Sequence, residues 1–86
     1  MFNLIEMYIK KMTKEDISNF AKSKEIDLSN EELDFTYNFV KRNYKDFLGN
    51  PKLLDLNRYK NNYSQENFNK IVKVYQEYTQ KYANYL

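Results

Sequence analysis

The side chains that most often carry out catalysis are absent or isolated in this sequence. It contains no Cys and no His, which removes thiolate nucleophiles, the usual base of a serine nucleophile and the common zinc and haem ligands. The twelve acidic residues show no metal-ligand spacing, and no His is present to complete a di-iron set. A single Gly excludes a glycine-rich loop for phosphate. We therefore expect no enzyme activity, no catalytic residue, no metal and no cofactor.

Basic and aromatic residues are interleaved in the later half of the chain. Residues 45–86 carry seven basic and four acidic residues, although the whole chain has a net charge of only +2. Single-stranded nucleic acids bind where bases stack on rings and cations hold phosphates. Nucleic-acid binding is therefore the alternative function. The competing interpretation is that these basic residues form an ordinary solvated surface. Its candidate residues are Lys41, Arg42, Lys45, Arg58 and Lys60.

Tyrosines recur at steps of three and four residues near the C-terminus. The chain has nine Tyr and six Phe, more rings than a few short helices can enclose. Tyr is large, amphipathic and low in rotamer entropy, which favours it at protein interfaces. An exposed strip would predict a surface for another protein or a second copy, whereas buried rings with solvated hydroxyls are the competing interpretation. The candidate partner-binding residues are Tyr75, Tyr78, Tyr82 and Tyr85.

The elements that must position these residues are helices. Gly49 and Pro51 are the only Gly and Pro, too few for the turns of a β-rich fold. Apolar spacing predicts helices over about 2–11, 14–24, 30–48 and 65–84, a short helix over 51–59 that begins at Pro51, and a turn over 60–64. In the first helix Leu4 and Tyr8 broaden the apolar face. We predict an all-α fold, a compact bundle of four to five short helices, as one domain over residues 1–86.

Polar residues mark the predicted helix starts. Thr13 with Asp16 and Ser29 with Glu32 have the spacing of a capping box, in which side chain and backbone bond reciprocally. Ser64 has the N-cap position of the last helix.

The segment 13–32 has the outline of a DNA-binding helix–turn–helix. Its second helix would bring Glu31, Glu32 and Asp34 toward the phosphates, where their charge is repulsive. We therefore interpret the segment as scaffold. Its expected inward-facing residues are Ile17, Phe20, Ile26 and Leu28.

This segment also resembles the first half of a small helical family of Firmicutes, the YqfT-type proteins. The resemblance lies in Thr13, Asp16, Ile17, Phe20, Ala21, Ile26, Leu28 and Ser29. A Leu-rich turn near Leu53–Leu56 and a final amphipathic helix extend it more loosely. The family has no established activity, so the resemblance implies a small helical cytosolic protein and no site residues.

The start of the chain lacks the basic segment and uncharged core of a signal peptide, and no apolar window approaches the length of a membrane span. We expect a cytoplasmic protein without membrane contact. The leading hypothesis is a non-enzymatic protein-interaction module, either self-associating or a small phage-type inhibitor of a larger protein machine. The Asn-, Tyr- and Lys-rich composition suits the second form.

Overall fold

The computed structural model describes residues 2–49 and 55–83, and these ranges form five helices and no strand. In chain order they are α1 (Phe2–Lys11), α2 (Lys14–Ser23), α3 (Asn30–Gly49), the 3-10 helix η2 (Leu56–Asn62) and α4 (Gln65–Ala83). The radius of gyration is 12.7 Å, near the value of about 12 Å expected for a compact chain of this length. The predicted all-α bundle of four to five short helices is confirmed.

The helix starts are set by the predicted caps. Thr13 N donates to Asp16 Oδ2 at 2.9 Å and Asp16 N to Thr13 Oγ1 at 3.1 Å. Ser29 and Glu32 form the same reciprocal pair, at 2.8 and 3.1 Å. Ser64 Oγ accepts from Asn67 N at 3.1 Å. Each pair satisfies backbone donors that the first helical turn leaves without a partner.

The segment before α4 departs from the prediction. Residues 60–62, expected in a turn, belong to η2, and this expectation was wrong. The start expected at Pro51 lies outside the described residues. η2 is instead capped by Asp55, whose Oδ1 accepts from Asn57 N at 3.1 Å.

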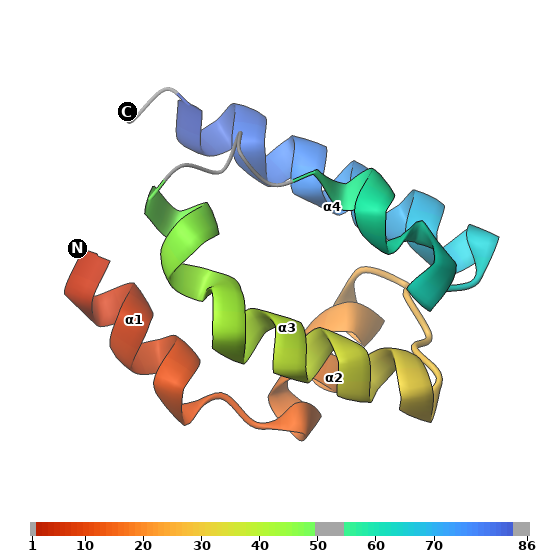
Figure 1. Ribbon diagram of the computed structural model, residues 1–86, viewed down its shortest axis with the longest axis horizontal. Helices are drawn as coiled ribbons and strands as arrows, with labels where there is room; N and C mark the ends of the chain where they lie inside the picture. The colour runs from red at the N-terminus through yellow and green to blue at the C-terminus, as the bar shows by residue number, and fades with distance from the viewer. Residues whose placement is uncertain (1, 50–54, 84–86) are drawn as a thin grey trace.

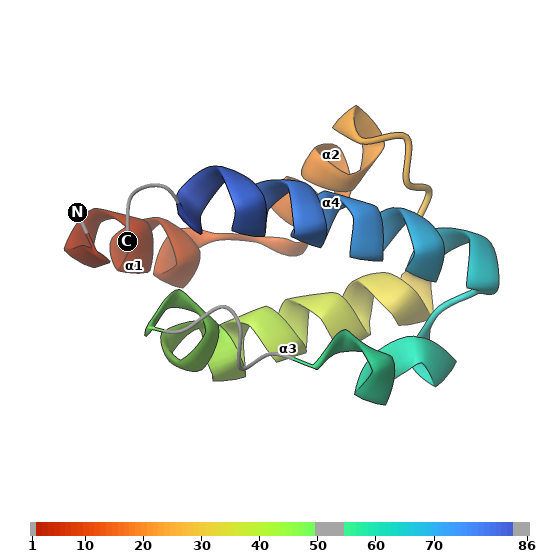
Figure 2. The ribbon, with the colours of Figure 1, turned by 90° about the horizontal axis from the view of Figure 1, so that it is seen from above.

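Helix α3 runs through the middle of the fold, with α1 and α2 packed on it (Figure 1). In the view of Figure 2, α4 runs across the middle of the picture, and η2 lies lower in the picture, near the start of α4. The most buried hydrophobic residues come from α1, α2, the linker after α2 and α3. They are Ile9, Ile17, Ala21, Ile26 and Tyr44. None of the described side chains falls below 2% exposure, which indicates a small core.

One residue expected to face inward does not. Ile17 and Ile26 are buried and Leu28 is half-buried, but Phe20 is 48% exposed. Phe20 lies about 100° round α2 from the buried Ala21. Its ring meets α4, with its centroid 6.2 Å from that of Tyr78. The expectation that Phe20 joins the core is therefore corrected.

Candidate functional site

Helix α1 carries an apolar face that its neighbours leave uncovered. Leu4 is 71% exposed, Met7 54% and Tyr8 64%. Their spacing of three and four residues places them on one side of the helix. Ile9, about 100° further round, is only 6% exposed. Helix α1 is thus apolar on two sides, and only the side with Ile9 joins the core. We call Leu4, Met7 and Tyr8 the α1 strip.

Contacts with α3 fix α1 along its other side. Lys41 Nζ donates to the carbonyl oxygens of Ile9 and Lys10, both at 2.7 Å. These carbonyls belong to the last turn of α1, where a cation stabilises the negative end of the helix dipole. Tyr44 Oη donates to Glu6 Oε1 at 3.1 Å. Burial and the Glu6 carboxylate raise the pKa of Tyr44, so its hydroxyl stays protonated and keeps this bond at neutral pH. The α1 strip is therefore held pointing outward.

The tyrosines predicted to bind a partner have a different environment. Tyr75 and Tyr78 are half-buried, and burial raises the pKa of Tyr75. Lys24 Nζ lies 5.6 Å from the ring centroid of Tyr78, which also contacts Phe20 as described above. The side chain of Tyr82 and all of Tyr85 lie outside the described residues. The Tyr78 ring thus packs α4 on α2, and the partner-binding role of the four tyrosines stays a prediction.

The five basic residues of the alternative function are spread over two elements. Lys41 is engaged with α1, and its Nζ also lies 5.4 Å from the ring centroid of Tyr37. Arg42 and Lys45 are exposed on α3, and Arg58 and Lys60 on η2.

Four aromatic residues of α3 and of the segment around η2 pack on one another. The ring centroids of Phe39 and Tyr59 are 4.8 Å apart in an edge-to-face arrangement. Phe35 lies 5.7 Å from Tyr63 and 5.9 Å from Tyr59. The Tyr63 hydroxyl contacts Thr36 Oγ1 at 2.5 Å, and burial raises the pKa of Tyr63. These rings join η2 to α3.

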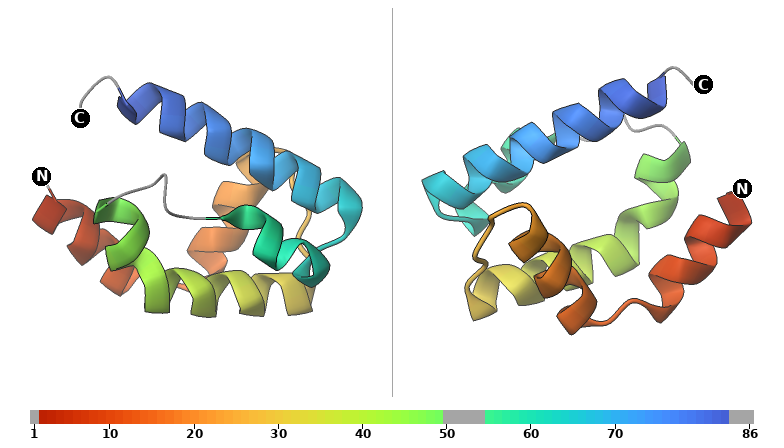
Figure 3. Two further views of the ribbon diagram at one scale, coloured as in Figure 1. Left: turned by 45° about the horizontal axis from the view of Figure 1, so that its top comes forward. Right: turned by 180° about the vertical axis from the view of Figure 1, so that it is seen from behind.

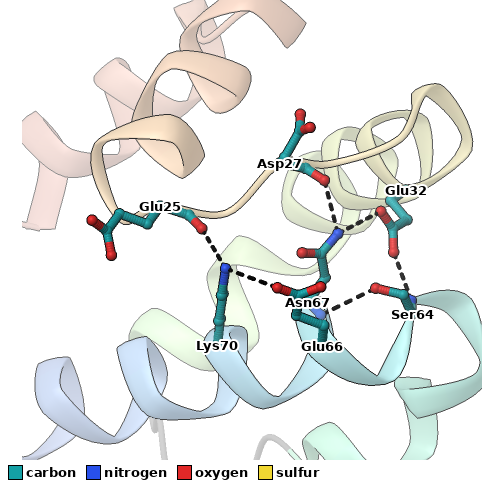
Figure 4. A network of polar contacts seen from close by, with 7 residues as sticks. All are labelled: Glu25, Asp27, Glu32, Ser64, Glu66, Asn67 and Lys70. Atoms are coloured by element: carbon teal, nitrogen blue, oxygen red, sulfur yellow. Dashed lines mark hydrogen bonds and ion pairs between the residues drawn. The ribbon is translucent and has the colours of Figure 1, made fainter.

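A buried polar network links α3 to the linker after α2 and to α4 (Figure 4). Glu32 is only 7% exposed and Asn67 8%. Glu32 Oε1 accepts from Ser29 N at 2.8 Å and from Asn67 Nδ2 at 2.9 Å, while Oε2 accepts from Ser64 N at 2.7 Å. Asn67 Nδ2 also donates to the Asp27 carbonyl oxygen at 2.9 Å. One carboxylate therefore serves the starts of both α3 and α4.

The electrostatics of Glu32 support a structural role. Burial acts to raise the pKa of Glu32, but hydrogen bonds from Ser29, Ser64 and Asn67 together outweigh it and hold the pKa below the ordinary value. The side chain is thus a fully bonded anion at neutral pH. Nearby, Lys70 Nζ donates to the Glu25 carbonyl oxygen at 2.7 Å and lies 3.5 Å from Glu66 Oε1 (Figure 4). Sequence reasoning identified the cap of Glu32 but missed Asn67, which only the fold brings to it.

The described residues form neither a metal site nor a membrane-spanning helix. Among residues 2–49 and 55–83, no group of three or more acidic, Cys or His side chains is placed to hold a metal ion. Within the described helices, none has both the length and the apolar character needed to cross a bilayer. An open hollow of about 490 Å³ lies between η2 and α4, with Lys60 at its border. It brings Lys60 to the rings of Tyr63 and Phe68, but to none of the other four candidate cations.

The α1 strip was missed as a site from the sequence, because Leu4 and Tyr8 were taken to broaden a single apolar face. The available signal was the width of that face, since a helix packed on one neighbour covers only part of it. Comparisons with protein families, curated proteins and solved structures gave no match for this chain. The resemblance to the YqfT-type family therefore stays a prediction.

Proposed function

We propose that this protein is a non-enzymatic protein-interaction module that docks through the α1 strip. The observation that carries the proposal is the exposure of Leu4, Met7 and Tyr8 on one helix face, at 71, 54 and 64%. Removing apolar surface from water contributes roughly 25 cal/mol per Å². Contiguous exposed apolar side chains in a chain with so small a core are a typical mark of an interaction surface.

The α1 strip supports this function better than the tyrosines of α4. Tyr78 already contacts Phe20 and Lys24, and Tyr75 is half-buried. Occupying these rings with a partner would compete with the packing of α4. The α1 strip can be covered without displacing any contact that holds α1 on α3.

Nucleic-acid binding has less support. The ammonium group of Lys41 already bonds two carbonyl oxygens. The rings of Tyr59 and Tyr63 pack on Phe35, which leaves their faces less accessible for base stacking, and Tyr44 is buried. The net charge of +2 supplies little of the electrostatic attraction that dominates binding to phosphates.

The test is affinity capture from the native host by the wild-type chain and by the triple variant Leu4→Gln/Met7→Gln/Tyr8→Gln. Gln has a helix propensity close to those of Leu and Met, so α1 should persist, and circular dichroism checks that it does. Lys73→Gln is the control, because it introduces Gln at an exposed position of α4 outside the α1 strip. Light scattering on the same proteins measures self-association.

We expect the triple variant to lose an associated protein, or the self-associated form, that Lys73→Gln retains. The proposal fails if the wild-type chain is a monomer and the triple variant captures the same proteins in the same amounts. It fails equally if Lys73→Gln and the triple variant behave alike.

A further inference from the structure

We infer that the α1 strip inserts into an apolar groove of a larger protein and that the rim of this groove carries carboxylates. The inference rests on the proposed function and names the class of partner.

The spacing fits the helix-in-groove mode of recognition. In this mode an amphipathic helix places side chains at positions i, i+3 and i+4 into a hydrophobic groove, and Leu4, Met7 and Tyr8 have this spacing. Helix α1 lies at the edge of the molecule, with α3 on one side of it (Figure 3). Because Lys41 and Tyr44 hold it from the α3 side, a groove can approach from the opposite side while α1 stays folded.

The extent of the α1 strip argues against a second copy as the occupant. From Leu4 to Tyr8 the helix rises about 6 Å, at about 1.5 Å per residue. A stable dimer buries about 800 Å² per partner, contributed by roughly 20 residues a side. Two such strips laid against each other fall short of that area. A groove contacts the α1 strip and both flanks of the helix at once, so a short helix can bury most of its outer surface there.

The charges beside the α1 strip favour an acidic partner. Lys10 and Lys11 occupy the last turn of α1, and its first turn has no acidic residue. The side chain of Lys10 is 64% exposed and Lys11 is also exposed. Glu6 is the one carboxylate of α1, and it is 21% exposed and bonded to the Tyr44 hydroxyl. Lys10 Nζ lies 3.7 Å from Glu6 Oε1, so the exposed side chain of Lys11 is the cation that a carboxylate of the partner would meet first. A second copy would bring the same two cations, whereas a carboxylate rim complements them and disfavours wrong partners.

The test places a photo-crosslinking residue in the full-length chain, expressed in its native host, as Tyr8→benzoylphenylalanine. The control is Gln76→benzoylphenylalanine, at an exposed position on α4. Each is combined with Lys11→Glu, which reverses the charge, and with Lys11→Arg, which keeps it. Mass spectrometry then identifies the crosslinked segment of the partner.

We expect the probe at position 8, and not the one at 76, to form an adduct with a larger protein through a segment bordered by Asp or Glu. Lys11→Glu should lower the yield of this adduct about tenfold, whereas Lys11→Arg should leave the yield close to that with Lys11. An adduct with the mass of two copies overturns the inference, and so does a yield that Lys11→Glu leaves unchanged. The same holds if no adduct forms or if the probe at position 76 gives the same adduct.

Failure of the inference and failure of the proposed function give different results. In one case the triple variant abolishes capture, but the adduct is a dimer or its yield does not depend on the charge of Lys11. The proposal of docking through the α1 strip is then supported, and the inference of a groove with a carboxylate rim is overturned. If capture does not depend on the α1 strip and the chain is a monomer, both proposals fail.

Discussion

The change Glu32→Gln tests the buried network with almost no change in side-chain shape. The carboxylate of Glu32 accepts hydrogen bonds from Ser29 N, Ser64 N and Asn67 Nδ2, at 2.8, 2.7 and 2.9 Å. A Gln side chain offers one oxygen and one NH₂ group, and the NH₂ group must face an N–H donor wherever it is placed. At least one of the three donors therefore loses its acceptor, and the negative charge is also removed.

The expected cost follows from the burial of these groups. A hydrogen bond to a charged group contributes about 1.5–3 kcal/mol, and a buried donor without an acceptor costs about 1–3 kcal/mol. We expect Glu32→Gln to lower the free energy of unfolding by about 2–4 kcal/mol. In a domain of this size each 1 kcal/mol shifts the melting temperature by about 4–8 °C. The melting temperature should therefore fall by about 8–32 °C.

The assay is thermal and urea unfolding at pH 7, followed by circular dichroism. The matched control is Glu31→Gln, which removes an exposed carboxylate from the same first turn of α3. That change weakens only the interaction with the helix dipole, about 0.3–1 kcal/mol. If Glu32→Gln costs no more than Glu31→Gln, the account of the buried network is wrong.

Three further predictions follow from described contacts. Because the folded pKa of Glu32 lies below its ordinary value of 4.5, its stabilisation is present above that pH and is lost as the pH falls through the folded pKa. Urea unfolding should therefore show the wild type losing more stability than Glu32→Gln between about pH 5 and pH 3, and parallel curves would contradict this. Lys41→Met removes the donor to two carbonyl oxygens of α1. Amide hydrogen exchange in α1 should therefore become faster, and the free energy of unfolding should fall by about 1–2 kcal/mol. The control Lys45→Met, at an exposed position of α3, should change neither the exchange nor the free energy. Phe39→Leu removes the edge-to-face contact with Tyr59, which contributes about 0.5–1.5 kcal/mol. Amide exchange should therefore become faster in η2 before it does so in α2. Equal protection of the η2 amides in the wild type and in Phe39→Leu would refute this.

The features predicted from the sequence are those that depend on neighbours along the chain. Thr13, Ser29 and Ser64 mark helix starts because each bonds a backbone amide or side chain three residues away. Such bonds need no tertiary contact, so residue type and spacing are enough to predict them. Apolar periodicity predicted the helices between these starts for the same reason.

The features that were missed depend on distant residues. Asn67 reaches Glu32 across 35 positions of sequence, and no local pattern announces that contact. Phe20 has the spacing of a core residue, but it stays 48% exposed and its ring meets Tyr78 of α4. The α1 strip was missed for the same reason, because periodicity identifies an apolar face but does not show whether a neighbouring helix covers it.

The position of Glu32 has a consequence for the entropy of the chain. Its carboxylate bonds the amide of Ser29 and also that of Ser64, so the segment between them, which contains α3 and η2, forms a loop closed at its base by one side chain. Such a contact acts as a noncovalent cross-link, because it removes freedom that the open segment would have. Breaking it returns that freedom to the whole loop. A substitution at Glu32 should therefore loosen η2 as well, although the three partners of its carboxylate, Ser29, Ser64 and Asn67, lie outside η2.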